Sequence, residues 1–376
     1  MTNIPDPVEL TQTLIRMDTI NPPGNEEPAA RYLGELLAEA GLQVSYPRLG
    51  DNSTGLIALL PGRSSGSPLV FTGHLDTVPV GEAQWDSPPH DAEIKDGHLI
   101  GRGASDMKSG IAAMVVTALR LAGDPERGRS LFFIFTAGEE TGCEGASQMK
   151  ESGVLPDDAG AIVVAEPSGN IPFLGHKGAF WLECTAKGKS AHGSMPDLGE
   201  NAIYTAARAA LSLENFFSGA DVHPQFGTPT VNVGTFIGGS KINMVPDSAR
   251  FRVDLRTVPG LEHAELFEEI QGHIGRNISI QRLIDLPGIL TPVTDPWIMQ
   301  VLDSIERIQG TRPEPGYVNF FTDASVLTSA LGNPPTLILG PGESSQAHQT
   351  NEYCVVEKIG QAVEFYVEIA RNWLEH

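Results

Sequence analysis

Cysteine is scarce in this chain of 376 residues. The three cysteines, Cys143, Cys184 and Cys354, are far apart and odd in number. Their spacing gives neither a disulfide framework nor a zinc-knuckle pattern, which favours a reducing compartment and predicts a cytoplasmic protein. The first residues also lack a basic region followed by an apolar stretch, so we expect no signal peptide.

Basic residues are also few in this chain. Lysine and arginine total 25 against 47 acidic residues, which gives a net charge of −22 with histidine neutral. Such a chain repels phosphate backbones and anionic lipids, so we expect neither nucleic acid nor membrane partners. No apolar run approaches the length that crosses a bilayer. The hydrophobic content of 40% is ordinary for a globular protein, and the length suits two domains.

Short apolar runs alternate with amphipathic segments in the first third of the chain. Residues 69–73, 131–135 and 161–165 are typical of buried strands, and residues 33–40 place their apolar side chains on one helical face. Strands that alternate with helices indicate a mostly parallel sheet covered by helices on both faces.

The pattern changes between residues 179 and 286. Alternating strands with a helix between them are typical of a smaller α+β domain. The first pattern resumes after residue 287, with a further buried strand at 336–339. We therefore predict a split α/β/α catalytic domain with a mostly parallel sheet, formed by residues 1–178 and 287–376, and an inserted α+β lid or dimerisation domain at 179–286.

Histidine and acidic residues follow four of the predicted buried strands. They are His74 and Asp76 after 69–73, Glu139 and Glu140 after 131–135, Glu166 after 161–165, and His348 in the loop after 336–339. Asp106 lies in the loop before a predicted helix. Each residue has an ordinary alternative, such as helix capping for Asp106. Ligands bind at the carboxyl ends of parallel strands, so the set as a whole indicates one convergent site.

Two histidines with several carboxylates are ligands that suit Zn²⁺, with Co²⁺ or Mn²⁺ possible. A two-metal site needs a carboxylate that bridges both ions and further ligands on each. The counts work for this division: Asp106 bridges, His74 and Glu166 hold one ion, and Glu140 and His348 hold the other.

The adjacent pair Glu139 and Glu140 suits a division of labour. One can bind metal while its neighbour moves a proton, and the residues alone leave the order open. Asp76 shares an extended segment with His74, so its carboxylate could orient that imidazole.

Several short motifs stand out along the chain: GHLDTVP (73–79), GRGASDMK (101–108), TAGEETG (136–142), EP (166–167), GKSAHGS (188–194) and GPG through AHQ (340–349). They resemble the motifs of the zinc-dependent M20 peptidase and deacylase family, in the branch of acetylornithine deacetylase and succinyl-diaminopimelate desuccinylase. They occur in the family's order and span nearly the whole chain.

The resemblance implies roles for individual residues. The metal ligands fall on His74, Asp106 (bridging), Glu140, Glu166 and His348, the general base on Glu139, and the residue behind the histidine ligand on Asp76. A cis peptide is implied between Asp106 and Met107. The inserted domain is implied to form a homodimer. His192 would stabilise the oxyanion in the partner's site, and Asn243 and Arg256 would bind the substrate.

Together these features predict a di-zinc amidohydrolase with two Zn²⁺ per subunit. It would cleave the amide bond of a small N-acyl amino acid, in the manner of acetylornithine deacetylase. Glutamate at position 166 goes, in this family, with deacylases and carboxypeptidases, so the alternative is a carboxypeptidase acting on a dipeptide or an N-acylated glutamate.

Two readings from other classes are disfavoured. A non-catalytic metal-binding protein would have lost the base or a ligand, and all are present. A serine hydrolase would need a Gly-x-Ser-x-Gly turn after a strand, and no predicted strand is followed by one.

Overall fold

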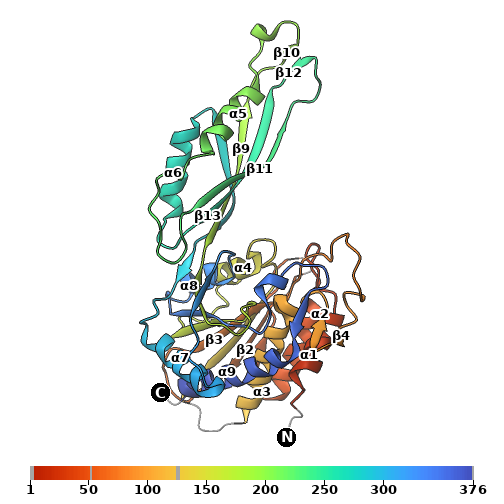
Figure 1. Ribbon diagram of the computed structural model, residues 1–376, viewed down its shortest axis with the longest axis vertical. Helices are drawn as coiled ribbons and strands as arrows, with labels where there is room; N and C mark the ends of the chain where they lie inside the picture. Colours follow the sequence, from red (N-terminus) through yellow and green to blue (C-terminus); the bar gives the residue numbers. More distant parts are fainter. Residues whose placement is uncertain (1–3, 51–52, 124–127, 375–376) are drawn as a thin grey trace. The chain divides into compact units, whose positions relative to one another are not determined.

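The computed structural model describes residues 4–50, 53–123 and 128–374, and the chain divides into two compact units (Figure 1). The first unit comprises Met1–Gly175, Leu290–Gly316 and Thr322–His376, and the second comprises His176–Ile289 and Tyr317–Phe321. The sequence-based division did not assign Tyr317–Phe321 to the insertion. This segment joins the second unit because the Lys177 amide donates to the Val318 carbonyl and the Phe321 ring packs edge-on against Trp181.

A central sheet forms the core of the first unit. Its order is β1 (Gln43–Ser45), β2 (Leu56–Leu60), β6 (Leu131–Thr136), β3 (Leu69–His74), β7 (Ala161–Val164), β17 (Thr336–Ile338), β8 (Phe173–His176) and β15 (Ile289–Leu290), and β16 (Gly316–Val318) pairs with β8. Strands β6, β3, β7 and β17 run parallel to one another. Every residue of β3 and β7 is buried, as expected for strands covered on both faces. The predicted α/β class with a mostly parallel sheet is confirmed.

Helices cover this sheet. They are α1 (Pro7–Arg16), α2 (Glu27–Glu39), α3 (Ser109–Ala122), α4 (Glu144–Ser152), α7 (Pro296–Gln309), α8 (Ala324–Ala330) and α9 (Val356–Leu374). Helix α1 begins where the Asp6 carboxylate accepts from the amides of Val8 and Glu9, with proline in the first turn. Helix α9 packs on the sheet through Tyr366, whose ring contacts Phe71 and whose hydroxyl donates to the Leu339 carbonyl.

A small sheet and two short helical turns complete the first unit. The sheet consists of β18 (Tyr353–Val355), β5 (His98–Ile100) and β4 (Glu93–Lys95), and the turns are η1 (Ala104–Lys108) and η3 (Ser344–Gln346). The peptide between Asp106 and Met107 is cis, as the resemblance implied.

The second unit is an antiparallel sheet packed against two helices. Its strand order is β11 (Thr230–Gly238), β13 (Ser248–Thr257), β9 (Gly178–Lys187) and β14 (Ile278–Leu286), and the helices are α5 (Ala202–Leu213) and α6 (His263–Ile274) (Figure 1). A short strand pair, β10 (Ala191–His192) with β12 (Met244–Val245), and the turn η2 (Pro196–Leu198) complete it. One face of β13 is buried against the helices while alternate residues are more exposed, which gives the period of two in its sequence.

No helix in residues 4–50, 53–123 and 128–374 has both the length and the apolar character that crossing a membrane requires.

Glu26, just before α2, is a fully buried carboxylate in the first unit. Ser53 lies beside its carboxylate, and the hydrogen bond from Ser53 lowers the pKa of Glu26 by less than burial raises it. Burial, together with the charge of Asp76, raises the pKa of Glu26 from 4.5 to about 7. In the folded chain the carboxyl therefore keeps its proton over a pH range in which the unfolded chain releases it.

We expect Glu26→Gln to change how stability depends on pH. As pH rises from about 4.5 to about 7, the unfolded wild type binds fewer protons than the folded wild type, so its free energy of unfolding falls. Glutamine does not titrate and lacks this loss. Urea unfolding at a series of pH values should show the free energy of unfolding of the variant rising relative to that of the wild type across that window. Above the window the difference between the two should stay constant. A difference independent of pH would contradict the expectation.

Candidate metal centre

The histidine and acidic side chains of the first unit gather at the carboxyl ends of its parallel strands. His74 is the last residue of β3, Glu139 and Glu140 follow β6, Glu166 follows β7, and His348 follows β17. The parallel register brings these strand ends to one edge of the sheet. Asp106 reaches the same place from η1.

Asp106 lies between the two histidines. Its Oδ1 is 3.0 Å from His74 Nε2, and its Oδ2 is 3.5 Å from His348 Nε2. The remaining carboxylates divide in the same way: Glu166 Oε1 is 3.7 Å from His74 Nε2, and Glu140 Oε2 is 2.9 Å from His348 Nε2. One carboxylate thus presents one oxygen to each of two ligand groups, which is the arrangement that a bridging ligand requires.

Glu139 and Glu140 face different sides of this cluster. Ligand atoms of His74, Glu139 and Glu166 lie within 4.8 Å of one another, as do those of His74, Asp106 and Glu140. Glu140 is the residue that contacts His348. Glu139 is buried and accepts a weak hydrogen bond from the Cys143 thiol.

Asp76 lies beside His74 with both its main chain and its carboxylate. His74 Nδ1 is 2.9 Å from the Asp76 carbonyl oxygen and 3.6 Å from the Asp76 carboxylate. A carbonyl oxygen can only accept, so Nδ1 must carry a hydrogen to bond the Asp76 carbonyl. In the neutral ring the other nitrogen, Nε2, then carries the lone pair, and Nε2 is the nitrogen that faces Asp106. The Asp76 carboxylate also accepts from the amides of Glu139 and Glu140, each at 3.3 Å, and so holds the turn that carries both glutamates.

The cluster concentrates negative charge in a buried place. Burial, with the charge of Glu166, raises the pKa of Glu139 well above its usual range, and burial with the charge of Asp106 does the same for Glu166. Hydrogen bonds to Asp106 and Glu140 raise the pKa of His348 to about 10. Protons or cations must balance such a group of carboxylates, and divalent ions displace protons from ligands of this type. The donor set therefore fits divalent metal.

Asp323, at the start of α8, is a further acidic residue beside this cluster. It is buried, its Oδ2 accepts a hydrogen bond from the Thr136 hydroxyl at the end of β6, and its charge contributes to the raised pKa of Glu139. Burial raises the pKa of Asp323 itself to about 6. No predicted buried strand precedes this residue, so the strand-end pattern gave no signal for it.

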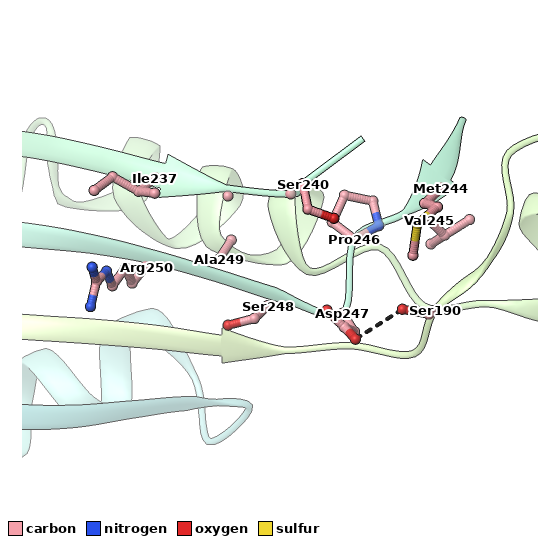
Figure 2. Close-up of a pocket in the computed structure, with 12 residues that line it drawn as sticks. Ser190, Ile237, Ser240, Met244, Val245, Pro246, Asp247, Ser248, Ala249 and Arg250 are labelled. Carbon is pink, nitrogen blue, oxygen red and sulfur yellow. Dashed lines mark hydrogen bonds between the residues drawn. The ribbon is translucent and has the colours of Figure 1, made fainter. Parts of the chain in front are cut away.

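His192, Asn243 and Arg256 all lie in the second unit. His192 is exposed in β10, and its Nδ1 is 2.8 Å from the Ser194 hydroxyl. Asn243 is adjacent, because its carbonyl accepts from the Gly193 amide at 2.8 Å. Figure 2 shows the neighbouring pocket, where the Ser190 hydroxyl donates to the Asp247 carboxylate at 2.9 Å.

Arg256 lies at the other end of this unit's sheet. It pairs with Ala179 on β9, whereas Ser248, close to the β10–β12 pair, pairs with Lys187. Eight residues of strand separate these pairings, about 26 Å at 3.3 Å per residue. The Arg256 guanidinium is 2.9 Å from the Asp254 carboxylate and lies over the Trp181 ring. The second unit therefore brings His192 and Asn243 together and holds Arg256 apart from them.

The chain is similar to several known proteins. A succinyl-diaminopimelate desuccinylase, described as probable, from Staphylococcus epidermidis is 29% identical over 98% of each chain. The acetylornithine deacetylase of Vibrio cholerae is 31% identical over 90% of this chain and 89% of that protein. The crystal structure of an M20 family metallo-carboxypeptidase from Sulfolobus solfataricus has the same fold, with a TM-score of 0.80, 18% identity, and coverage of 99% of this chain and 100% of that one.

A family model also matches most of the chain. Residues 70–372 match the Peptidase family M20/M25/M40 and include every strand end and loop that contributes to the cluster. The chain belongs to this family, and it is a hydrolase that acts on amide bonds.

Proposed function

We propose that the protein is a di-zinc amidohydrolase that removes the acyl group from a small N-acyl amino acid, in the manner of acetylornithine deacetylase. The observation that carries the proposal is Asp106, whose two oxygens face two different histidines. The names of the two curated relatives, a desuccinylase and a deacetylase, support an N-acyl amino acid as substrate.

Two ions would be held by five side chains. His74 and Glu166 would hold one, Glu140 and His348 the other, and Asp106 would bridge them. Bound there, the ions supply Lewis acidity, which lowers the pKa of water and polarises the carbonyl of the substrate.

Glu139 is the proton carrier of the proposed reaction. It is buried beside His74 and Glu166, and the Asp76 carboxylate holds its amide. It would take a proton from the attacking water and deliver it to the leaving amine. Both transfers need a carboxylate that is not itself a metal ligand, and Glu140, in contact with His348, is the better ligand of the pair.

The second unit would supply the substrate contacts. Arg256 carries a planar guanidinium that suits a substrate carboxylate, in a chain that otherwise repels anions. His192 would donate to the developing oxyanion, and Asn243 beside it would contact the substrate.

We also propose that the protein is a homodimer formed through the second unit. Strand β11 is at the edge of the sheet, and Phe236 and Ile237 on it are 42% and 57% exposed, with Tyr204 and Leu211 of α5 at 64% and 68%. An exposed edge strand with apolar side chains is a common pairing surface. Because His192 lies far from Arg256 in its own subunit, both can act on one substrate if His192 comes from the partner.

Metal analysis combined with a hydrolysis screen tests the proposal. We expect two divalent ions per chain, loss of activity on chelation, and recovery when Zn²⁺, Co²⁺ or Mn²⁺ is added. N-acetyl and N-succinyl amino acids should be cleaved faster than dipeptides, and sedimentation should give a dimer. Preferred cleavage of dipeptides or of N-acylated glutamate would instead favour a carboxypeptidase. Hydrolysis that survives chelation would contradict the metal mechanism.

A further inference from the structure

We infer that Glu352, together with Arg102, is a positioning residue that fixes the backbone of the turn carrying Asp106 and so sets the direction of the bridging carboxylate. The inference rests on the proposed function and extends it to side chains that do not themselves contact metal or substrate.

The Glu352 carboxylate binds the turn through its main chain. Its Oε1 accepts from the amides of Ser105 at 2.8 Å and Asp106 at 2.9 Å, and its Oε2 accepts from the amide of Gly103 at 3.0 Å. Glu352 is fully buried, so water does not compete for these bonds. Three contacts within four residues leave the turn little freedom, and the amide of Asp106 is among the groups held.

Arg102 extends this anchorage to two further loops. Its Nη1 donates to Glu352 Oε2 at 2.6 Å and reaches the Gln349 carbonyl at 3.4 Å, and its Nη2 donates to the Pro79 carbonyl at 3.2 Å. Gln349 directly follows the proposed ligand His348, and Pro79 ends the segment that begins with His74. The pair therefore ties together the three loops that bring His74, Asp106 and His348 to the cluster.

The geometry goes beyond what an ordinary ion pair needs. A buried pair is weak evidence for stability, because removing both charges from water costs about as much as their attraction returns. In this protein both Glu352 oxygens accept from amides of the turn that carries Asp106, and the Ser105 hydroxyl of that turn donates to the Tyr353 carbonyl of β18, the strand that follows His348. Groups that orient ligands in this way typically change metal affinity or activity by about 10- to 100-fold when replaced.

Glu352→Gln is the direct test. The amide group places a donor where Oε2 accepts from Gly103 and Arg102, so the turn should loosen. We expect Zn²⁺ affinity, measured by competition with a chelator, to fall by about 10- to 100-fold for both ions. In the metal-free protein, hydrogen exchange at the Ser105 and Asp106 amides should become faster. Glu364→Gln is the matched control: it removes the exposed ion pair with Arg120, 2.6 Å long, and should change neither measurement.

A second variant covers the case in which Glu352→Gln does not fold. In the double variant Arg102→Met with Glu352→Gln, no buried charge is left unpaired, and the same loss of Zn²⁺ affinity is expected. Wild-type Zn²⁺ affinity in either folded variant would overturn the inference, even if its unfolding free energy had dropped. Failure of the proposed function would be recognised differently, because the wild type itself would then bind no divalent ions. That result would also refute the positioning role of Glu352.

Discussion

Replacing Glu139 by glutamine should abolish most of the activity without removing metal. The amide matches the carboxylate in size but cannot accept a proton from water. General acid–base groups contribute about 10²- to 10⁴-fold to rate, so we expect kcat to fall by an amount in this range while KM changes little. Because Glu139 is not among the five proposed ligands, metal content should remain at two ions per chain. Steady-state kinetics with metal analysis of the same preparation makes the measurement.

The neighbouring residue provides the matched control. Glu140→Gln changes the same chemical group one position along the chain, but Glu140 contacts His348 at 2.9 Å. We expect this variant to bind one of the two ions more weakly, so that added metal recovers part of the rate. If Glu140→Gln instead kept both ions and lost kcat irreversibly, while Glu139→Gln lost metal, the roles of the two glutamates would be reversed.

The parts of the site that lie at strand ends could be predicted from sequence. Buried parallel strands are short apolar runs, and the polar residue that follows each run falls on the same edge of the sheet. This local pattern predicts that His74, Glu139, Glu140 and Glu166 lie close together. The structure brings all of them into one cluster.

The supporting residues could not be found in the same way. Arg102 and Glu352 meet across 250 positions of sequence, and nothing in the residues around either one indicates the other. The sequence places the Asp76 carboxylate beside His74, where it lies 3.6 Å from Nδ1, but gives no sign that the Asp76 carbonyl contacts the same nitrogen or that the carboxylate also holds the Glu139–Glu140 turn. Side-chain direction depends on the backbone dihedrals of the loop, which composition and periodicity do not determine.

Long-range contacts also decide the boundary of the second unit. The segment Tyr317–Phe321 belongs to that unit because of its contacts with Lys177, Trp181 and Phe226. A turn sequence, Pro313 to Gly316, comes directly before it, but nothing in its five residues indicates which unit they pack against. Long-range packing, rather than local preference, decides where such a segment belongs.

Replacing Asp106 by alanine should remove both metal ions at once. Its Oδ1 and Oδ2 face His74 and His348 respectively, so its loss takes one ligand from each ion and leaves the two sites without the charge between them. We expect metal content after dialysis to fall from two ions per chain to near zero, with activity at background. His74→Ala and His348→Ala should each weaken the binding of mainly one ion. Asp303→Ala, which removes only an exposed ion pair with Arg312, should keep both. Two tightly held ions in the Asp106 variant would show that this carboxylate does not bridge them.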